Sequence, residues 1–146
     1  MIDFAALSRL EIAEFLVAHQ SELGIADLTA QKVVESLESG KAVLEARQYG
    51  FALIQQTPAA DGTIPHLWVL FIDNEQRESG LGSRFVRELL KKYSAKHHMS
   101  VWCEGSRRRR FFGRLGFVVE SRFGEIRRMT TNRASASRQR FAPQGL

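Results

Sequence analysis

Apolar residues recur at helical spacing in the first part of the chain. The capping-box pattern Ser8-x-x-Glu11 is followed by apolar positions within residues 12–19 that fall on one helical face. Residues 30–37 repeat this spacing and lead to Gly40, a residue type that commonly ends a helix. The pattern therefore predicts two amphipathic helices before the first long strand.

Shorter apolar runs, bounded by glycine, proline and other turn formers, follow these helices and predict strands. The run over residues 66–72 is apolar on both faces, as expected of a strand in the middle of a sheet. Residues 57–62 are rich in turn formers and are expected to form a loop. The predicted strands are Ile2–Phe4, Ala42–Ala46, Phe51–Gln55, His66–Ile72, Met99–Cys103, Phe117–Ser121 and Glu125–Met129, with helices over Gly82–Ala95 and Ser106–Leu115.

The most informative motif is Arg77-Glu78-Ser79-Gly80-Leu81-Gly82, between the central strand and the next helix. In such a strand–turn–helix, unpaired backbone N–H groups and the helix dipole favour a phosphate at the helix N-terminus. The two glycines let a phosphate approach the backbone closely. The spacing is neither that of a P-loop nor that of a dinucleotide-binding motif. A turn that needs glycine only for tight packing is the alternative interpretation.

A second motif, Phe111-Phe112-Gly113-Arg114-Leu115-Gly116-Phe117, is typical of a short helix that ends at a glycine before a strand. Together the two motifs resemble the GNAT superfamily of acetyl-CoA-dependent N-acetyltransferases, in which the first reads Q/R-x-x-G-x-G/A and the second approximately F-Y-x-x-x-G-F. The resemblance covers roughly residues 40–130. It implies an α/β (α+β) GNAT fold, with a mixed central sheet of about six to seven strands, about four flanking helices, and strands four and five splayed.

The resemblance implies acetyl-CoA as the co-substrate and assigns it two groups of residues. The backbone of the splayed fourth strand, at Leu70, Phe71 and Ile72, would hold the pantetheine arm and, as an oxyanion-type contact, the acetyl carbonyl. The pyrophosphate would lie on the turn and the start of the helix, at Arg77, Glu78, Ser79, Gly80, Leu81, Gly82 and Ser83.

His66, eleven residues before Arg77, is the predicted catalytic base. Strand alternation predicts that it shares a face with Trp68, Leu70 and Ile72. Histidine suits the role because its ordinary pKa, about 6.5, lies near working pH. By resemblance, serotonin-acetylating members of the family carry a histidine at this position and histone-acetylating members a glutamate. A histidine that only makes local hydrogen bonds is the alternative.

Two positions depart from the family pattern. Phe112 stands where the family usually has a tyrosine that protonates the leaving thiolate, so solvent or another group would supply that proton. We expect Phe112 to line the thiol end of the cofactor site as an apolar wall. Gly105 stands where the family usually has an asparagine near the start of this helix.

Arg107–Arg110 occupy the first turn of the same helix, where cations oppose the helix dipole. The phosphates of the cofactor, particularly its 3′-phosphate, would give a reason for this placement. Because a helix turns about 100° per residue, only one or two of the four can face one ligand, and Arg109 is the predicted contact. A solvated basic helix end is the alternative interpretation for the others.

The composition fits a globular protein. The chain has 146 residues, of which 44% are apolar, which suits one domain over residues 1–130 and a basic, disordered tail over residues 131–146. One cysteine excludes an intrachain disulfide, and no apolar run approaches about 18 residues, so a cytoplasmic location is expected. No metal is expected, because His97, His98 and Cys103 lack the spacing of zinc ligands.

Charge is divided unevenly, since the net charge of +5 combines −3 over residues 1–100 with +8 over residues 101–146. The leading hypothesis is an N-acetyltransferase in which a primary amine attacks acetyl-CoA directly in a ternary complex. A GNAT-fold protein that binds acyl-CoA without turnover and a nucleic-acid-binding protein that uses the basic segment are the alternatives. Residues 1–63, with 9 acidic and 4 basic residues, favour a cationic acceptor such as a polyamine, an aminoglycoside-like amine or a protein lysine. A homodimer is compatible with these features.

Overall fold

A computed structural model describes residues 2–20, 28–73 and 80–131 of the chain. The predicted tail lies outside these residues, apart from Thr131 at the end of the last strand. The elements are a 3₁₀ helix η1 (Phe4–Ala6), helices α1 (Arg9–Ala18), α2 (Ala30–Glu38), α3 (Leu81–Tyr93) and α4 (Ser106–Arg114), and strands β1 (Ala42–Arg47), β2 (Gly50–Ala59), β3 (Gly62–Ile72), β4 (Ser100–Glu104), β5 (Phe117–Phe123) and β6 (Ile126–Thr131).

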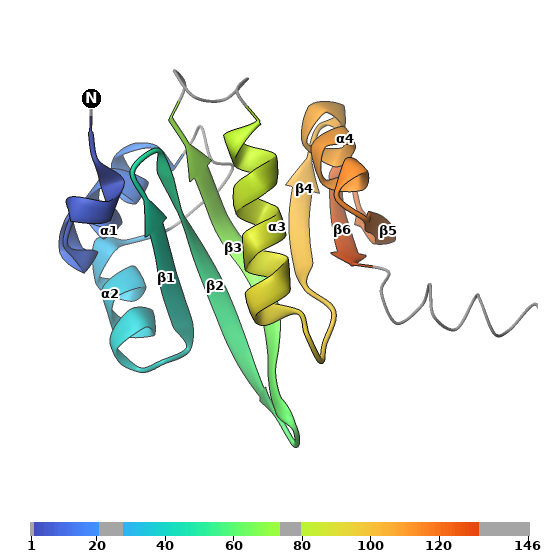
Figure 1. Cartoon of the computed structure of the whole chain (residues 1–146), viewed down its shortest axis with the longest axis horizontal. Coiled ribbons are helices and arrows are strands. Elements are labelled where there is room, and N and C mark those ends of the chain that lie inside the picture. Colours follow the sequence, from blue (N-terminus) through green and yellow to red (C-terminus); the bar gives the residue numbers. More distant parts are fainter. Residues whose placement is uncertain (1, 21–27, 74–79, 132–146) are drawn as a thin grey trace, which may run out of the picture.

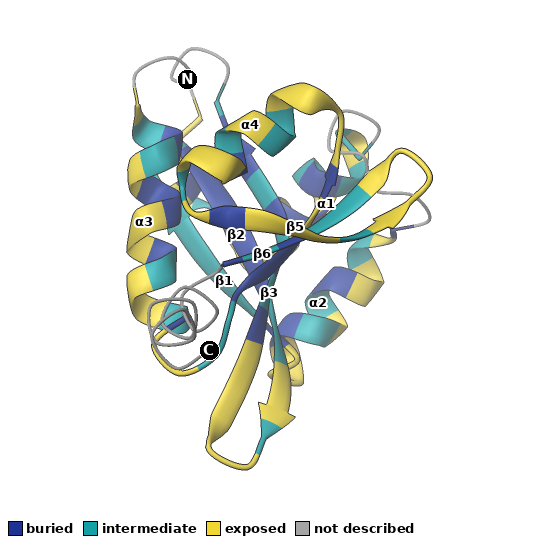
Figure 2. Cartoon of the chain, turned by 90° about the vertical axis from the view of Figure 1, so that its right-hand side faces the viewer, coloured by how far each residue is buried: buried dark blue, intermediate teal, exposed yellow. Residues whose placement is uncertain are grey.

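The strands of the described residues form one mixed sheet of six strands, in the order β1-β2-β3-β4-β6-β5. All neighbours are antiparallel except β3 and β4, which run parallel. Helices α3 and α4 lie on one side of the sheet, and α1 and α2 lie on the other (Figures 1 and 2). This arrangement confirms the predicted fold class. Among the described helices, none combines the length and hydropathy needed to cross a bilayer.

Two apolar cores hold the layers together. The core under α3 and α4 runs across the whole sheet, from Ala52 on β2 to Phe117 on β5. The core under α1 and α2 reaches only as far as β3, where Val69 and Phe71 contribute to it. As a result, α1 and α2 cover only the β1–β3 half of their side of the sheet.

Two sequence predictions in this half of the molecule are wrong. Residues 2–4 do not form a first strand, because the Asp3 side chain caps a 3₁₀ turn that carries Phe4 into the core. Residues 57–62 are not a loop, because β2 and β3 pair as far as Ala59 and Gly62 and leave only a two-residue turn. This hairpin extends beyond the rest of the sheet (Figure 1).

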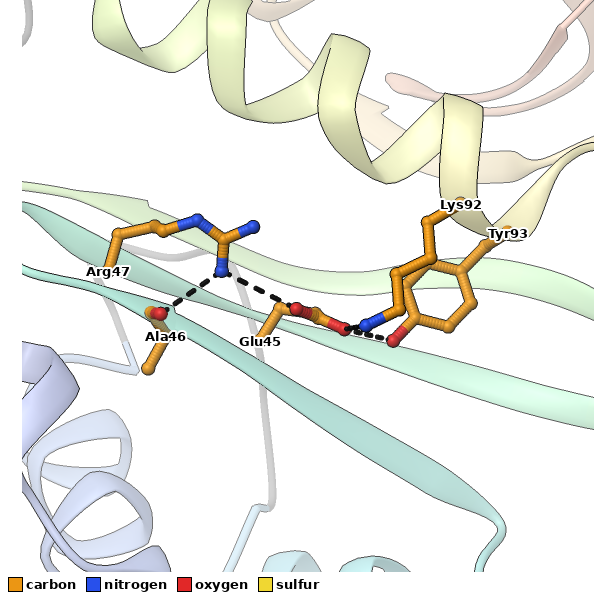
Figure 3. Close-up of polar contacts among 5 residues, drawn as sticks. All are labelled: Glu45, Ala46, Arg47, Lys92 and Tyr93. Carbon is orange, nitrogen blue, oxygen red and sulfur yellow. Dashed lines mark hydrogen bonds and ion pairs between the residues drawn. The ribbon is translucent and has the colours of Figure 1, made fainter.

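Glu45 on β1 connects this strand to the C-terminal end of α3 (Figure 3). Its carboxylate accepts hydrogen bonds from the Lys92 ammonium, at 2.6 Å, and from the Tyr93 hydroxyl. A second cation, Arg47, lies 3.4 Å from the same carboxylate. Burial alone would raise the pKa of Glu45, but the bonds from Lys92 and Tyr93 outweigh it and hold the pKa below its usual value.

Gly50, the first residue of β2, is a position where backbone contact requires the absence of a side chain. A Cβ atom there would lie 2.1 Å from the carbonyl oxygen of Phe71, on the neighbouring strand β3. Any larger residue would therefore move the last part of β3.

We predict that Gly50→Ala lowers the free energy of unfolding by about 1–3 kcal/mol, the usual cost of overpacking a close contact. Urea denaturation measures this change. Gly113→Ala is the matched control, because its added Cβ on α4 would have no neighbour within 4 Å. The control should be neutral or stabilising by about 0.5–1 kcal/mol, since alanine favours a helix. Equal stability of the two variants would contradict the proposed contact with Phe71.

Candidate functional site

Strands β3 and β4 part soon after they meet. Their parallel ladder consists of only two register pairs, His66 with Ser100 and Leu67 with Val101. Beyond these pairs β3 continues to Ile72 and β4 to Glu104 without pairing with each other. The predicted splay of two central strands is therefore present, with its narrow end at His66 and its open end at the C-terminal ends of both strands.

A β-bulge at Trp68 lies just beyond the narrow end of the splay. Leu67 pairs with Ile54 and Val69 with Leu53, so Trp68 is an extra residue on β3. The extra residue shifts the side-chain alternation by one position.

The prediction that His66 shares a face with residues 68, 70 and 72 therefore holds for Trp68 and is wrong for Leu70 and Ile72. Leu67 and Ile72 contribute to the core under α3, whereas Val69 belongs to the core under α1 and α2. His66, next to Leu67, faces the side of α1 and α2. Leu70 and Ile72 face α3.

His66 lies at the point where the two strands separate, and its ring is half-buried. Its Nδ1 atom is 2.6 Å from the Ser100 hydroxyl, and its ring centroid is 6.5 Å from that of Trp102. Burial lowers the pKa of His66 to about 4, and the positive charge of Arg128 acts in the same direction. The imidazole is therefore neutral at physiological pH and can accept a proton.

The N-terminus of α3 follows the open end of β3. Gly80 caps it in a left-handed conformation, with φ of 82°, and among the described residues no side-chain cap bonds to the N–H groups of the first turn. A Cβ at Gly80 would have no neighbour within 4 Å, whereas one at Gly82 would contact Ile72 and Phe111 at 3.5–3.6 Å. The first turn, which includes Leu81 and Ser83, thus begins at a glycine with no described neighbour around its Cβ position, and its backbone donors suit a phosphate. Arg77, Glu78 and Ser79 lie outside the described residues.

Comparison with known proteins identifies the fold. No protein-family model matches the sequence, and a search of curated proteins gives no match. Among solved structures, a protein from Desulfovibrio desulfuricans assigned to the GNAT family of acetyltransferases matches with a TM-score of 0.62 and 18% identity, over 83% of this chain and 88% of that chain. NAA60 from Arabidopsis thaliana, in complex with a bisubstrate analogue, has a TM-score of 0.62 and 12% identity, over 84% and 92% of the two chains. The PaiA N-acetyltransferase from Thermoplasma acidophilum, in complex with coenzyme A, has a TM-score of 0.56 and 18% identity, over 87% and 80%. The chain has the GNAT fold.

Within this GNAT fold, Phe112 is a buried residue of α4. Its ring packs edge-on against Phe117 and Phe111, at centroid distances of 5.2 and 5.0 Å, inside the core under α3. Phe111, which belongs to the second motif but was not predicted as a site residue, is the member of the pair that reaches Gly82 on α3. The boundary between α3 and α4 is therefore apolar at this point.

Arg109 lies on the part of α4 that faces β5. Its Nε donates to the Gly105 carbonyl, at 3.4 Å, and with Arg110 it borders a shallow hollow that also involves Phe117 and Val119. Arg107 and Arg108 precede Phe111 by four and three residues, so they share its helical face. The contact predicted for Arg109 stays a prediction.

Sequence reasoning missed Ser100 and the bulge. Ser100 is the polar position at the start of the apolar strand β4, and a buried serine in such a strand signals a hydrogen-bonded partner. The bulge has no comparable signal, because Leu67, Trp68 and Val69 are all apolar and fit either face.

We predict that the ring protons of His66 keep their NMR chemical shifts from about pH 8 down to about pH 5, because its pKa lies near 4.

The depressed pKa of His66 also makes the stability of the fold depend on pH. Between about pH 6.5 and 4 the unfolded chain binds a proton that the folded protein does not, so stability falls as the pH falls through this window. His66→Gln should remove that part of the pH dependence. A midpoint for His66 near 6.5 would contradict the burial argument.

Proposed function

We propose that the chain is an N-acetyltransferase that transfers the acetyl group of acetyl-CoA to a primary amine. The observation that carries the proposal is the alignment of three features along β3. These are a neutral histidine at the narrow end of the splay, a segment of β3 beyond it that does not pair with β4, and the N-terminus of α3, which begins after Gly80, at the open end.

The described residues fit the cofactor that the fold implies. The N–H groups of the first turn of α3, after Gly80, would hold the pyrophosphate. The β3 edge from Leu70 to Ile72, which does not pair with β4, would hold the pantetheine arm and polarise the acetyl carbonyl. Arg77, Glu78 and Ser79 complete the predicted phosphate turn, and Arg109 is retained as a predicted contact to a phosphate.

His66 would act as the general base. When Nδ1–H donates to the Ser100 hydroxyl oxygen, Nε2 is left as an acceptor for the proton of the attacking amine, directly or through one water. Ser100 would be a positioning residue that fixes the ring and its tautomer. The reaction forms a C–N bond and breaks the thioester C–S bond, and the thiolate takes its proton from solvent because Phe112 has none to give.

A direct transfer agrees with the state of the only cysteine. Burial raises the pKa of Cys103 to about 11, and the thiol lies in the core under α3. A protonated, buried thiol is a poor nucleophile, so an acetyl-cysteine intermediate has no support. The amine would therefore attack the thioester while both substrates are bound.

Acetyl-CoA should stabilise the wild-type protein in a thermal shift assay and leave Gly80→Glu almost unaffected, because the added carboxylate would occupy the phosphate position. Gly124→Glu is the matched control. Gly124 also has a positive φ, of 62°, and open space around its Cβ, but it lies in the β5–β6 turn. Calorimetry that gives equal affinities for Gly80→Glu and the control would exclude phosphate binding at α3.

His66→Ala should lower kcat/KM for the amine by about 10²–10⁴-fold while leaving the affinity for acetyl-CoA unchanged, as expected on loss of a general base. Ser100→Ala should have a smaller effect, mainly on kcat. His97→Ala is the control, because His97 pairs with Asp61 at 2.8 Å, away from the splay. Thiol release measures all three. Unchanged turnover in His66→Ala would show that His66 is structural, and binding of acetyl-CoA without thiol release from any amine would favour a non-catalytic protein.

A further inference from the structure

The side of the sheet that carries His66 is covered by helices over only half of its width. The core under α1 and α2 ends at β3, and it includes no residue of β4, β5 or β6 among those described. The register places Ser100, Trp102 and Glu104 of β4 on this uncovered half. The β5–β6 hairpin extends this uncovered half beyond β4 and is largely exposed (Figure 2).

Three of the large apolar side chains on this half form what we call the apolar shelf. They are Trp102, Phe123 and Ile126, with 45%, 59% and 40% of their surface exposed. The rings of Trp102 and Phe123 meet edge to face at a centroid distance of 5.4 Å, and Phe123 pairs with Ile126 across the hairpin. Apolar side chains gathered in this way on a soluble protein typically mark a binding surface.

The apolar shelf is continuous with the candidate base. Trp102 is two residues after Ser100, the hydrogen-bond partner of His66, and its ring lies 6.5 Å from the imidazole. A molecule lying on Trp102 therefore has one end beside His66. Its other end would rest on Phe123.

The charges on this half of the sheet suit a single ammonium better than a polycation. Arg128, which pairs with Trp102 in the register, forms an ion pair with Glu120 at 2.7 Å, so these two charges offset each other. Glu104 lies opposite Ile126 and has no ion pair with the described residues. Glu104 therefore lies at the Phe123 end of the apolar shelf, and Arg128 lies nearer to His66. An acceptor with a single amine beside His66 and an apolar body on Trp102 brings no further cation close to Arg128, whereas a polyamine would.

We propose that the apolar shelf binds the acceptor, and that the acceptor is a primary amine carried by an aromatic or large aliphatic group. This inference rests on the proposed acetyltransferase function and specifies its substrate class. Trp102 and Phe123 are the specificity-determining residues. The proposal differs from the polyamine-like acceptor that the acidic N-terminal composition favours.

The test compares 2-phenylethylamine with spermidine as acceptors for the full-length protein. Trp102→Ala and Phe123→Ala should each lower kcat/KM for 2-phenylethylamine by about tenfold or more, with an unchanged KM for acetyl-CoA. Val119→Ala is the matched control, since Val119 is 42% exposed but pairs with Met129 and faces α4. It should behave as wild type. Binding of 2-phenylethylamine to the CoA-saturated protein, measured by calorimetry, reports on the shelf independently of turnover.

Each outcome bears on one of the two proposals. Thiol release with spermidine that exceeds that with 2-phenylethylamine, or an unchanged ratio in Trp102→Ala, overturns the aromatic acceptor and leaves the acetyltransferase standing. If 2-phenylethylamine binds, Trp102→Ala abolishes this binding and no amine gives thiol release, the acetyltransferase proposal is overturned and the shelf remains an amine site.

Two further outcomes would assign the shelf to another occupant. If the protein sediments as a dimer and Trp102→Ala converts it to monomers, the shelf binds a second copy of the chain. Tighter amine binding on deletion of residues 132–146 assigns it to that segment. Either result overturns the proposal.

Discussion

The separation of β3 from β4 is the constraint on which the rest of this structure depends. Two parallel strands that stay paired leave no backbone edge inside a sheet, whereas here the ladder ends after His66 and Leu67. The bulge at Trp68 follows immediately, and bulges increase strand twist and bending, which helps β3 to turn away from its neighbour. The segment of β3 after Leu67 is thus not joined to β4, and it lies between a histidine at one end and a helix N-terminus at the other.

The separation leaves the half of the sheet that contains β4, β5 and β6 with little strand pairing to the other half. With only two register pairs joining it to β3, this half depends on the core under α3 and α4, where Val101, Met129 and Phe117 are buried. Packing on one face is sufficient for an antiparallel sheet, whose second face can meet solvent. Because no described helix covers that second face, Trp102 and Phe123 stay exposed. The surface next to His66 is therefore a structural consequence of the splay.

The sequence predicts most of the elements because their hydrophobic periods are clear, as in the helix that buries Phe85 and Leu89. It also predicts the splay, through the resemblance carried by two motifs. It fails where geometry depends on pairing. The bulge at Trp68 puts Leu70 and Ile72 on the opposite face from His66, and the sequence could not show this, since three consecutive apolar residues satisfy either register. The sequence did not predict that the β2–β3 hairpin extends beyond Gln56, because residues of types that usually form turns occupy paired strand positions there. Ser100 could be connected with His66 only once the register of β3 and β4 was known.

Burial gives His66 a particular kind of basicity. Because burial and Arg128 both disfavour the imidazolium, His66 is neutral over the whole physiological range, but it holds a proton weakly. Such a base cannot readily strip a proton from a solvated alkylammonium, whose pKa is about 10. It can take a proton from an amine nitrogen that has already begun to bond to the acetyl carbon, because bond formation makes that nitrogen acidic. The acceptor must therefore lose its first proton before attack, and desolvation on an apolar surface promotes that loss by disfavouring the charged amine. Trp102 and Phe123 therefore contribute to reactivity as well as to recognition. The surface that holds the apolar body of the acceptor also favours the neutral form of its amine, from which the weak base His66 can take a proton during attack.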